Sequence, residues 1–186
     1  MKKAAERYGH FGLIKGTKDI WARDYMPVQV SENEFVSFLY EPDYLMKDDH
    51  GRALLTNSHE MAVTLPFRTK QVNIKLDGGN IVSNGSVAFM CDKIFDENPD
   101  WKEHHLGGYL TELLKLNGII FIPTGKEDPI GHADGIIRFI NEDAVLMMDY
   151  SKIDSEYHHQ VLKVLKDYKV EVEILPYQEP RNLEGA

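Results

Sequence analysis

One arrangement of residues occurs three times along this chain: an alternating apolar hairpin, then a helical segment, then a short apolar strand. The hairpins begin near residues 27, 80 and 135, so their spacing is about 50 to 55 residues, within the range of repeat architectures. A unit of this size cannot bury its helix and both faces of its sheet alone, so neighbouring units must pack against one another. The sequence therefore predicts an α/β fold of repeated strand–strand–helix–strand units.

The first copy follows the segment "WARD". Apolar strands are expected at 27–30 and 35–40, joined by a polar turn at 31–34. Helical patterning follows around 53–63, and a strand at 72–76 closes the copy.

The second copy turns at Asn84-Gly85, the strongest short signal for a hairpin. Leucines at helical spacing then predict a helix that ends at Asn117-Gly118. The strands expected around these signals are at 81–82, 87–90 and 119–123.

The third copy turns at 141–143 and continues with a helix over 154–168, and a strand at 170–176 closes it. Arranged around an axis, such units form an α/β propeller. The alternative is an ordinary α+β or α/β domain whose elements alternate without symmetry. The units that we expect, within one domain over 1–186, lie at about 21–76, 77–124 and 131–176.

Acidic residues outnumber basic ones, 30 to 21, which gives a formal net charge of -9. No run of Lys and Arg is present that could neutralise phosphates, so nucleic acid is not an expected partner. A negative field concentrates cations at a cleft, which favours a small cationic ligand.

Cys91 is the only cysteine, which excludes an intrachain disulfide and a cysteine-rich metal site. No apolar run has the length of a membrane helix, and no signal-peptide core follows the first residues. We therefore expect a cytoplasmic protein with no membrane partner. The first residues resemble the middle of a domain, so we also expect further sequence upstream.

Each hairpin is preceded by a short segment that contains an aspartate: "WARD", "LDGGN" and "GHADG". Asp24, Asp77 and Asp134 therefore occupy similar places in the three copies, and around an axis they would face one cavity. Carboxylates in a dry pocket raise one another's pKa unless a cation offsets their charge. We expect a positively charged ligand at this place.

Neighbouring residues extend this candidate site. Gly78 and Gly79 permit close approach of the backbone to a ligand, although a simple turn is the alternative. Arg23 can pair with a nearby carboxylate and so hold its loop. Trp21 offers a π face to a cation, but we favour core packing for its side chain.

His132 and Asp134 would point to the same side of an extended segment, so one imidazole and one carboxylate would share a pocket. Because histidine titrates near neutrality, His132 is a candidate general acid and base. Asp134 could orient that imidazole or bind a cationic substrate. The alternative is a surface feature or a satisfied core pair, and Gly131 and Gly135 on either side favour the functional interpretation.

A metal site is a second interpretation of these residues, since His132, Asp77 and Asp134 could supply mixed nitrogen and oxygen ligands. No His-Glu-x-x-His motif or cysteine pair is present, however, and we expect neither a metal nor another cofactor. Two adjacent histidine pairs in the predicted helices, at 104–105 and 158–159, are expected on solvated faces.

Three stretches, "WARDYMP", "LDGGNIV" and "GHADGIIRFI", together resemble the guanidine-modifying superfamily, and within it the agmatine deiminase and bacterial peptidylarginine deiminase branch. They stand in the expected order and are spread over most of the chain. The resemblance implies a fivefold pseudosymmetric α/β propeller of the pentein type, of which about three units are present here. It also implies hydrolysis of a guanidinium group to a ureido group with release of ammonia.

The resemblance implies roles for single residues as well. Asp24 and Asp134 would clamp the planar guanidinium of the substrate, and His132 would transfer protons. Asp77 would support the histidine or the substrate. Other residues of these stretches that would contact the substrate are Trp21, Arg23, Gly78, Gly79 and Asn80.

The implied substrate is a small guanidino compound such as agmatine or an arginine derivative, or else peptidyl-arginine. Tyr25 and Met26 differ from the residues of many agmatine-specific relatives, so the choice among these substrates stays open.

The chain departs from the family pattern at its end. The family's nucleophile is a cysteine in a glycine-rich segment near the C-terminus, which forms a thiouronium intermediate that water hydrolyses. This chain ends at "PYQEPRNLEGA" without such a segment, and at Cys91 a small buried thiol is the simpler explanation. We therefore expect an incomplete deiminase, inactive alone, in a homo-oligomer or with a partner chain that completes the propeller. The alternative is a non-catalytic guanidine-binding or assembly module.

Overall fold

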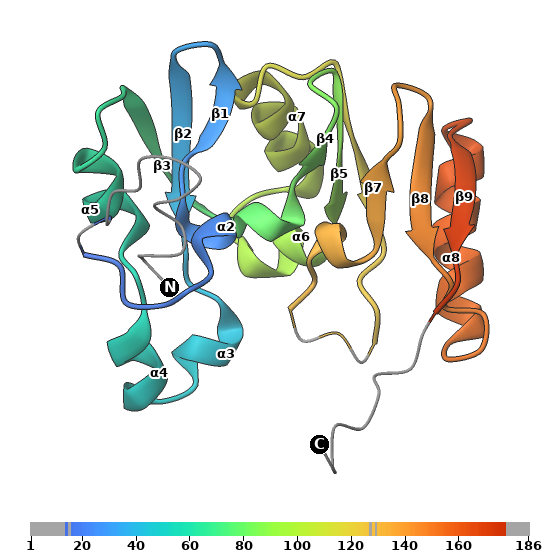
Figure 1. The fold of residues 1–186 in the computed structure, drawn as a ribbon, viewed down its shortest axis with the longest axis horizontal. Helices are drawn as coiled ribbons and strands as arrows, with labels where there is room; N and C mark the ends of the chain where they lie inside the picture. The colour runs from blue at the N-terminus through green and yellow to red at the C-terminus, as the bar shows by residue number, and fades with distance from the viewer. Residues whose placement is uncertain (1–13, 15, 127, 129, 178–186) are drawn as a thin grey trace, which may run out of the picture.

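The computed structural model of the 186-residue chain describes residues 14, 16–126, 128 and 130–177, and this part forms three small sheets (Figure 1). Each sheet has three strands, which follow one another in chain order. The strands are β1 (Val28–Ser31), β2 (Glu34–Leu39), β3 (Thr69–Lys75), β4 (Val82–Ser83), β5 (Val87–Cys91), β6 (Gly118–Ile122), β7 (Ile137–Phe139), β8 (Ala144–Met148) and β9 (Glu171–Leu175).

The three sheets share one pattern of strand directions. In each, the first two strands are antiparallel and form the hairpin, and the third is parallel to the second. A parallel neighbour requires a crossover connection, and helices supply it in all three cases. The chain is thus a mixed α/β protein with small sheets.

The helices lie in the crossovers and just before the hairpins. Those in the crossovers are α3 (Asp43–Met46), α4 (Asp49–Leu54), α5 (Ser58–Val63), α6 (Lys93–Glu97), α7 (Glu103–Leu113) and α8 (Ser155–Asp167). Each sheet is preceded by one short helical turn: α2 (Ala22–Tyr25), η1 (Gly78–Asn80) and η2 (Ala133–Gly135).

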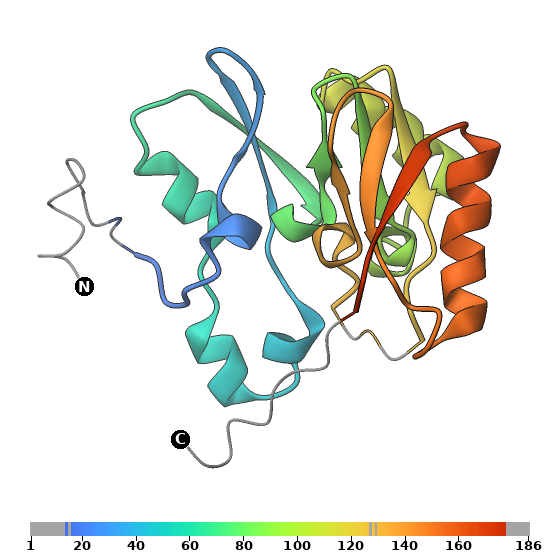
Figure 2. The ribbon, with the colours of Figure 1, turned by 45° about the vertical axis from the view of Figure 1, so that its right-hand side comes forward.

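Apolar packing joins the first and second sheets to the helix of the following unit. Phe38 and Ile74 of the first sheet lie in one cluster with Leu106 and Leu110 of α7. Phe89 of the second sheet lies in another cluster with residues of β7, β8 and α8. Figure 2 shows α8 alongside β6 and β9, which it contacts. Because each buried side chain of this size contributes about 1.5–3 kcal/mol, these clusters fix the relative positions of the units.

The third sheet differs, because no helix of the described residues packs on one of its faces. Successive side chains of strand β8 point to opposite faces of the sheet, and Val145 and Met147 pack towards α8. Leu146, Met148 and Leu175 lie on the opposite face, and none of them belongs to an apolar cluster with a helix of the described chain. Leu175 is 43% exposed.

Two predicted elements differ from those observed. The single helix expected around 53–63 is wrong, because Leu55 is extended and the side chain of Asn57 caps a second helix by accepting the Glu60 N–H. Helix α7 also ends earlier than the predicted stop: Lys115 has a φ of 58°, and the next N–H donates to Thr111 O at 3.0 Å.

Other local predictions are confirmed. Gly85 has a φ of 90° in the β4–β5 hairpin, and the Asn84 carboxamide accepts the Val87 N–H at 2.8 Å. The side chain of Asp154 caps α8 by accepting the Tyr157 N–H at 2.9 Å. Within the described ranges, no helix has the length and apolar character needed to cross a membrane.

Candidate functional site

The three short turns α2, η1 and η2 meet near the middle of the molecule (Figure 1). Each turn leads into the first strand of its own sheet, so the packing of the sheets sets the distance between the turns. Residues that are far apart in the sequence come together there.

The three turns begin with the same backbone hydrogen bond, although α2 continues as an α-helical turn and η1 and η2 are 3₁₀ turns. Counted from the residue whose carbonyl accepts this bond, Asp77 and His132 are first, Asp134 is third and Asp24 is fourth. All three aspartates thus lie in the turns that precede the hairpins and interact with one another, as expected, but at different positions of those turns. In each turn the first carbonyl accepts the N–H three residues later: Trp21 from Asp24 at 2.9 Å, Asp77 from Asn80 at 2.9 Å, and His132 from Gly135 at 3.1 Å.

His132 lies between two carboxylates from different units. Its Nε2 is 3.1 Å from Oδ2 of Asp77, a hydrogen bond, and its Nδ1 is 3.8 Å from Oδ1 of Asp24, an ion pair when the imidazole is protonated. The three side chains are only 17%, 11% and 9% exposed, in that order. Shielding from water strengthens the electrostatic interactions among them.

The glycine pair permits this close contact. Gly79 N–H donates to Oδ1 of Asp24 at 2.9 Å and so orients that carboxylate. A Cβ atom at Gly79 would lie 2.4 Å from Nδ1 of His132, and one at Gly78 would lie 2.0 Å from the carbonyl oxygen of Arg23. Only residues without a side chain fit at both positions.

The pKa of His132 is raised. Burial alone favours the neutral imidazole, but the hydrogen bond with Asp77 and the charges of Asp24, Asp77 and Asp134 outweigh it. The folded protein therefore holds a proton on this imidazole to a higher pH than an unfolded chain does.

The pKa of Asp24 is also raised, chiefly because burial disfavours its charge. The neighbouring charges of Asp77 and Asp134 act in the same direction, while His132 and the Gly79 N–H oppose the shift. A cation bound beside Asp24 would offset the cost of burying its charge, which agrees with the positively charged ligand predicted from the sequence.

Asp134 faces two arginines. Its Oδ2 lies 3.5 Å from Nη2 of Arg138 and 3.9 Å from Nε of Arg23, and Arg23 also donates from Nη2 to the carbonyl of Ile81 at 2.9 Å. Arg23 thus approaches a carboxylate, as expected. Arg138 is not among the site residues predicted from the sequence, although it lies within "GHADGIIRFI", four positions after Asp134.

The prediction that His132 and Asp134 point to the same side of an extended segment is wrong. Asp134 lies within the 3₁₀ turn η2, where successive side chains do not alternate. The two residues are electrostatic neighbours through the turn rather than through a strand.

Asn80 connects two units through its buried side chain, which is 3% exposed. Its Oδ1 accepts the N–H groups of Cys91 at 2.6 Å and Ala133 at 3.3 Å, and its Nδ2 donates to the Cys91 carbonyl at 3.3 Å. This arrangement favours a structural role for Asn80 over the predicted substrate contact.

Three further expectations concern burial. Core packing of Trp21 is wrong, because this residue is 55% exposed. The solvated position expected for His158 is also wrong: it is 8% exposed, and its Nδ1 accepts the Tyr150 N–H at 3.3 Å. The buried position of Cys91 is confirmed, since it is 0% exposed within an apolar cluster, and burial raises the pKa of its thiol.

Metal ligation was the alternative for these residues. In the part of the chain that the structure describes, no group of three or more His, Cys, Asp or Glu side chains is arranged to hold a metal ion.

Comparison with known proteins identifies the family. The model of the Porphyromonas-type peptidyl-arginine deiminases matches this chain over residues 3–184. The chain belongs to this family. No curated protein sequence matches it.

Solved structures with a similar fold include two agmatine deiminases. That of C. jejuni has a TM-score of 0.71 and 21% identity, over 90% of this chain and 53% of that chain. That of Enterococcus faecalis has a TM-score of 0.65 and 17% identity, over 84% of this chain and 49% of that chain. The chain therefore spans about half the length of these proteins, and at this level of identity the likeness concerns the fold alone.

Replacing Gly79 with alanine should displace His132 and Asp24. We expect the pKa of His132 to fall towards its ordinary value and the free energy of unfolding to fall by about 1–3 kcal/mol. NMR titration and urea denaturation measure the two effects. Gly108→Ala is the matched control, because a Cβ there meets open space on a helix, where alanine is favoured. An unchanged His132 titration in Gly79→Ala would contradict the described contacts.

The raised pKa of His132 predicts a pH-dependent contribution to stability. The protonated imidazole stabilises the fold fully below its ordinary pKa of 6.5, and this contribution is lost as the pH rises through the higher folded value. Replacing His132 with Gln should therefore cost more stability at about pH 5 than at about pH 9. Urea denaturation across this range, with the exposed His104→Gln as control, tests it; a loss independent of pH is the contrary result.

Proposed function

We propose that this chain forms part of an active site that hydrolyses a guanidinium group to a ureido group with release of ammonia. The observation that carries the proposal is the buried imidazole of His132 between the carboxylates of Asp77 and Asp24. Membership of the peptidyl-arginine deiminase family supports the same reaction.

Asp24 and Asp134 bind the guanidinium in this proposal. A guanidinium is planar and carries its donors in fixed directions, so carboxylates on two sides can both orient it and balance its charge. The raised pKa of Asp24 supports this role, because a bound cation would favour the ionised carboxylate. A bound guanidinium would then lower the pKa of Asp24 again.

The reaction proceeds through a cysteine nucleophile that this chain does not supply. The thiolate attacks the guanidinium carbon, and His132 gives a proton to the departing nitrogen, which leaves as ammonia. His132 then takes a proton from a water molecule that attacks the thiouronium carbon and restores the thiol. Asp77 keeps the imidazole oriented during both transfers. Cys91 is fully buried within the core and plays no part in these steps.

Agmatine, an arginine derivative and peptidyl-arginine all contain the group that the site would bind. Agmatine is the first ligand to test, since the two solved relatives are agmatine deiminases. We also propose a cytoplasmic location, which the single buried thiol supports.

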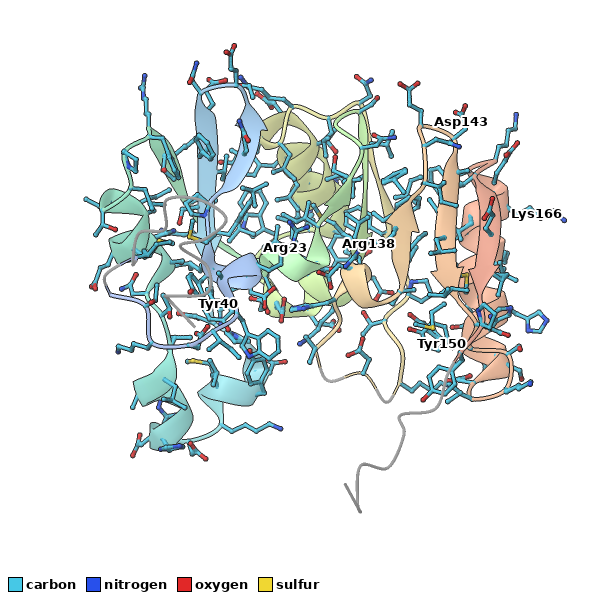
Figure 3. The ribbon with its side chains drawn as sticks, viewed as in Figure 1. Arg23, Tyr40, Arg138, Asp143, Tyr150 and Lys166 are labelled. Atoms are coloured by element: carbon cyan, nitrogen blue, oxygen red, sulfur yellow. The ribbon has the colours of Figure 1, made fainter. Side chains whose placement is uncertain are left out.

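Agmatine should bind this chain without being turned over. Isothermal titration should give a dissociation constant that rises more than about tenfold in Asp24→Asn and in Asp134→Asn, because each removes one charged hydrogen-bond acceptor. Asp143→Asn, at the tip of the β7–β8 hairpin and remote from Arg23 (Figure 3), is the charge-matched control and should bind normally. Absence of binding, or steady ammonia release that Cys91→Ser abolishes, contradicts the proposal.

The second candidate function is assembly into a complete propeller. In this proposal the units at about 21–76, 77–124 and 131–176 are three of five, and further units come from another copy or a partner chain. The face of the third sheet that bears Leu146, Met148 and Leu175 supports it. The first and second sheets both receive the helix of the next unit, whereas no helix in the described residues packs on this face.

Association should therefore depend on this face. Sedimentation velocity should detect self-association of the purified chain or its capture by a propeller-completing partner, and Leu175→Lys should weaken it by placing a charge in the apolar contact. Ile153→Lys is the matched control, because Ile153 is 56% exposed in the turn before α8. A well-folded chain that stays monomeric and has no partner is the result that contradicts assembly.

A further inference from the structure

Two arginines from different units approach the same oxygen atom of Asp134. Nη2 of Arg138, on strand β7, is 3.5 Å from Oδ2, and Nε of Arg23, in α2, is 3.9 Å from it. Figure 3 shows the two arginines near each other between α2 and β7. Asp134 is 23% exposed, so the carboxylate is partly shielded from water where the guanidinium groups reach it.

The other oxygen of this carboxylate has a different environment. Within residues 16–126, 128 and 130–177, no side chain forms an ion pair or hydrogen bond with Oδ1 of Asp134. Ion pairs of both arginines with Oδ2 favour one χ1 rotamer of Asp134 and one orientation of its carboxylate. Oδ1 is therefore held as the oxygen available to a ligand.

We propose that Arg138 is a positioning residue: with Arg23 it holds Oδ2 of Asp134, so that Oδ1 is presented to the guanidinium of the substrate. This inference rests on the proposed function, in which Asp134 binds that guanidinium. It adds a residue that does not itself touch the substrate.

Arg138 is the better of the two arginines to test. Arg23 also donates to the carbonyl of Ile81, and its own carbonyl lies against Gly78, so its replacement would disturb the contact between units. Besides its ion pair with Asp134, Arg138 donates a hydrogen bond to the adjacent Ile137 carbonyl, at 3.3 Å, and its side chain is 54% exposed. Ion pairs with this exposure contribute little to folding stability.

The space around Arg138 accommodates other side chains. Arg138 and Arg23 line an open cleft of about 350 Å³, together with Val82, Ser83 and Phe139. Glutamine or lysine can therefore replace Arg138 without overpacking.

A role through charge and a role in positioning predict opposite effects of Arg138→Gln on the binding of a cationic ligand. If Arg138 acts only through its charge, its removal lowers the repulsion that a cationic ligand meets and strengthens binding. If Arg138 holds Asp134, its removal frees the carboxylate to rotate, and binding weakens because the acceptor must be ordered again. The sign of the change separates the two roles.

The first measurement does not require a ligand. Three-bond Hα–Hβ NMR couplings of Asp134 report χ1, the torsion that places its carboxylate beside the two arginines, and so show whether the side chain keeps one rotamer. We expect a single rotamer in the wild type and in Arg138→Lys, and averaged couplings in Arg138→Gln. Arg52→Gln is the matched control, because Arg52 forms a similar exposed pair with Asp49, at 2.6 Å on helix α4.

The second measurement is agmatine binding by isothermal titration. The dissociation constant should rise about fivefold or more in Arg138→Gln and stay within about twofold of wild type in Arg52→Gln. Arg138→Lys keeps a cation near Oδ2 and should recover most of the affinity. Unchanged melting temperatures would show that these effects are not caused by unfolding.

The outcomes distinguish this inference from the proposed function. Asp134 couplings that do not change in Arg138→Gln, or tighter agmatine binding by that variant, overturn the positioning role. If the couplings change as expected but the wild type binds no agmatine or other guanidino compound, Arg138 positions Asp134 and the proposed function fails instead.

Discussion

The hydrogen bond between His132 and Asp77 is the interaction on which the site depends. It joins residues 55 positions apart, and the contact of the Asp24 carboxylate with Gly79 spans the same separation between the preceding units. Each bond therefore connects equivalent turns of neighbouring units. The imidazole lies between two carboxylates that would otherwise repel each other, and it keeps its proton to a higher pH as a result.

Apolar packing supplies the free energy that holds these charges together. The second sheet packs against β7, β8 and α8, and the first sheet packs against α7, so the turns at the inner ends of the sheets cannot separate. Buried polar contacts add specificity: Asn80 bonds to backbone groups of both β5 and η2. At the edge of this packed region, the two arginines balance the one carboxylate that remains partly exposed, Asp134.

Much of the architecture follows from local sequence signals. The hairpin at Asn84-Gly85 and the helix capped by Asp154 form where short-range rules place them, because their hydrogen bonds connect residues close in sequence. The break between α4 and α5 and the early end of α7 were missed. Both depend on the conformation of one residue, Leu55 in the first case and Lys115 in the second, which hydrophobic periodicity does not report.

The sequence by itself determined the repeated order of strands and helices, the acidic segments before the hairpins, and the presence of one histidine suited to proton transfer. It could not determine which carboxylate contacts that histidine, because all three aspartates precede a hairpin. Tertiary packing decided that Asp77 hydrogen-bonds to His132, that Asp24 approaches its other nitrogen, and that Asp134 faces arginines. Such pairings depend on the relative positions of separate units to within an ångström or so, and no local pattern of residues encodes them.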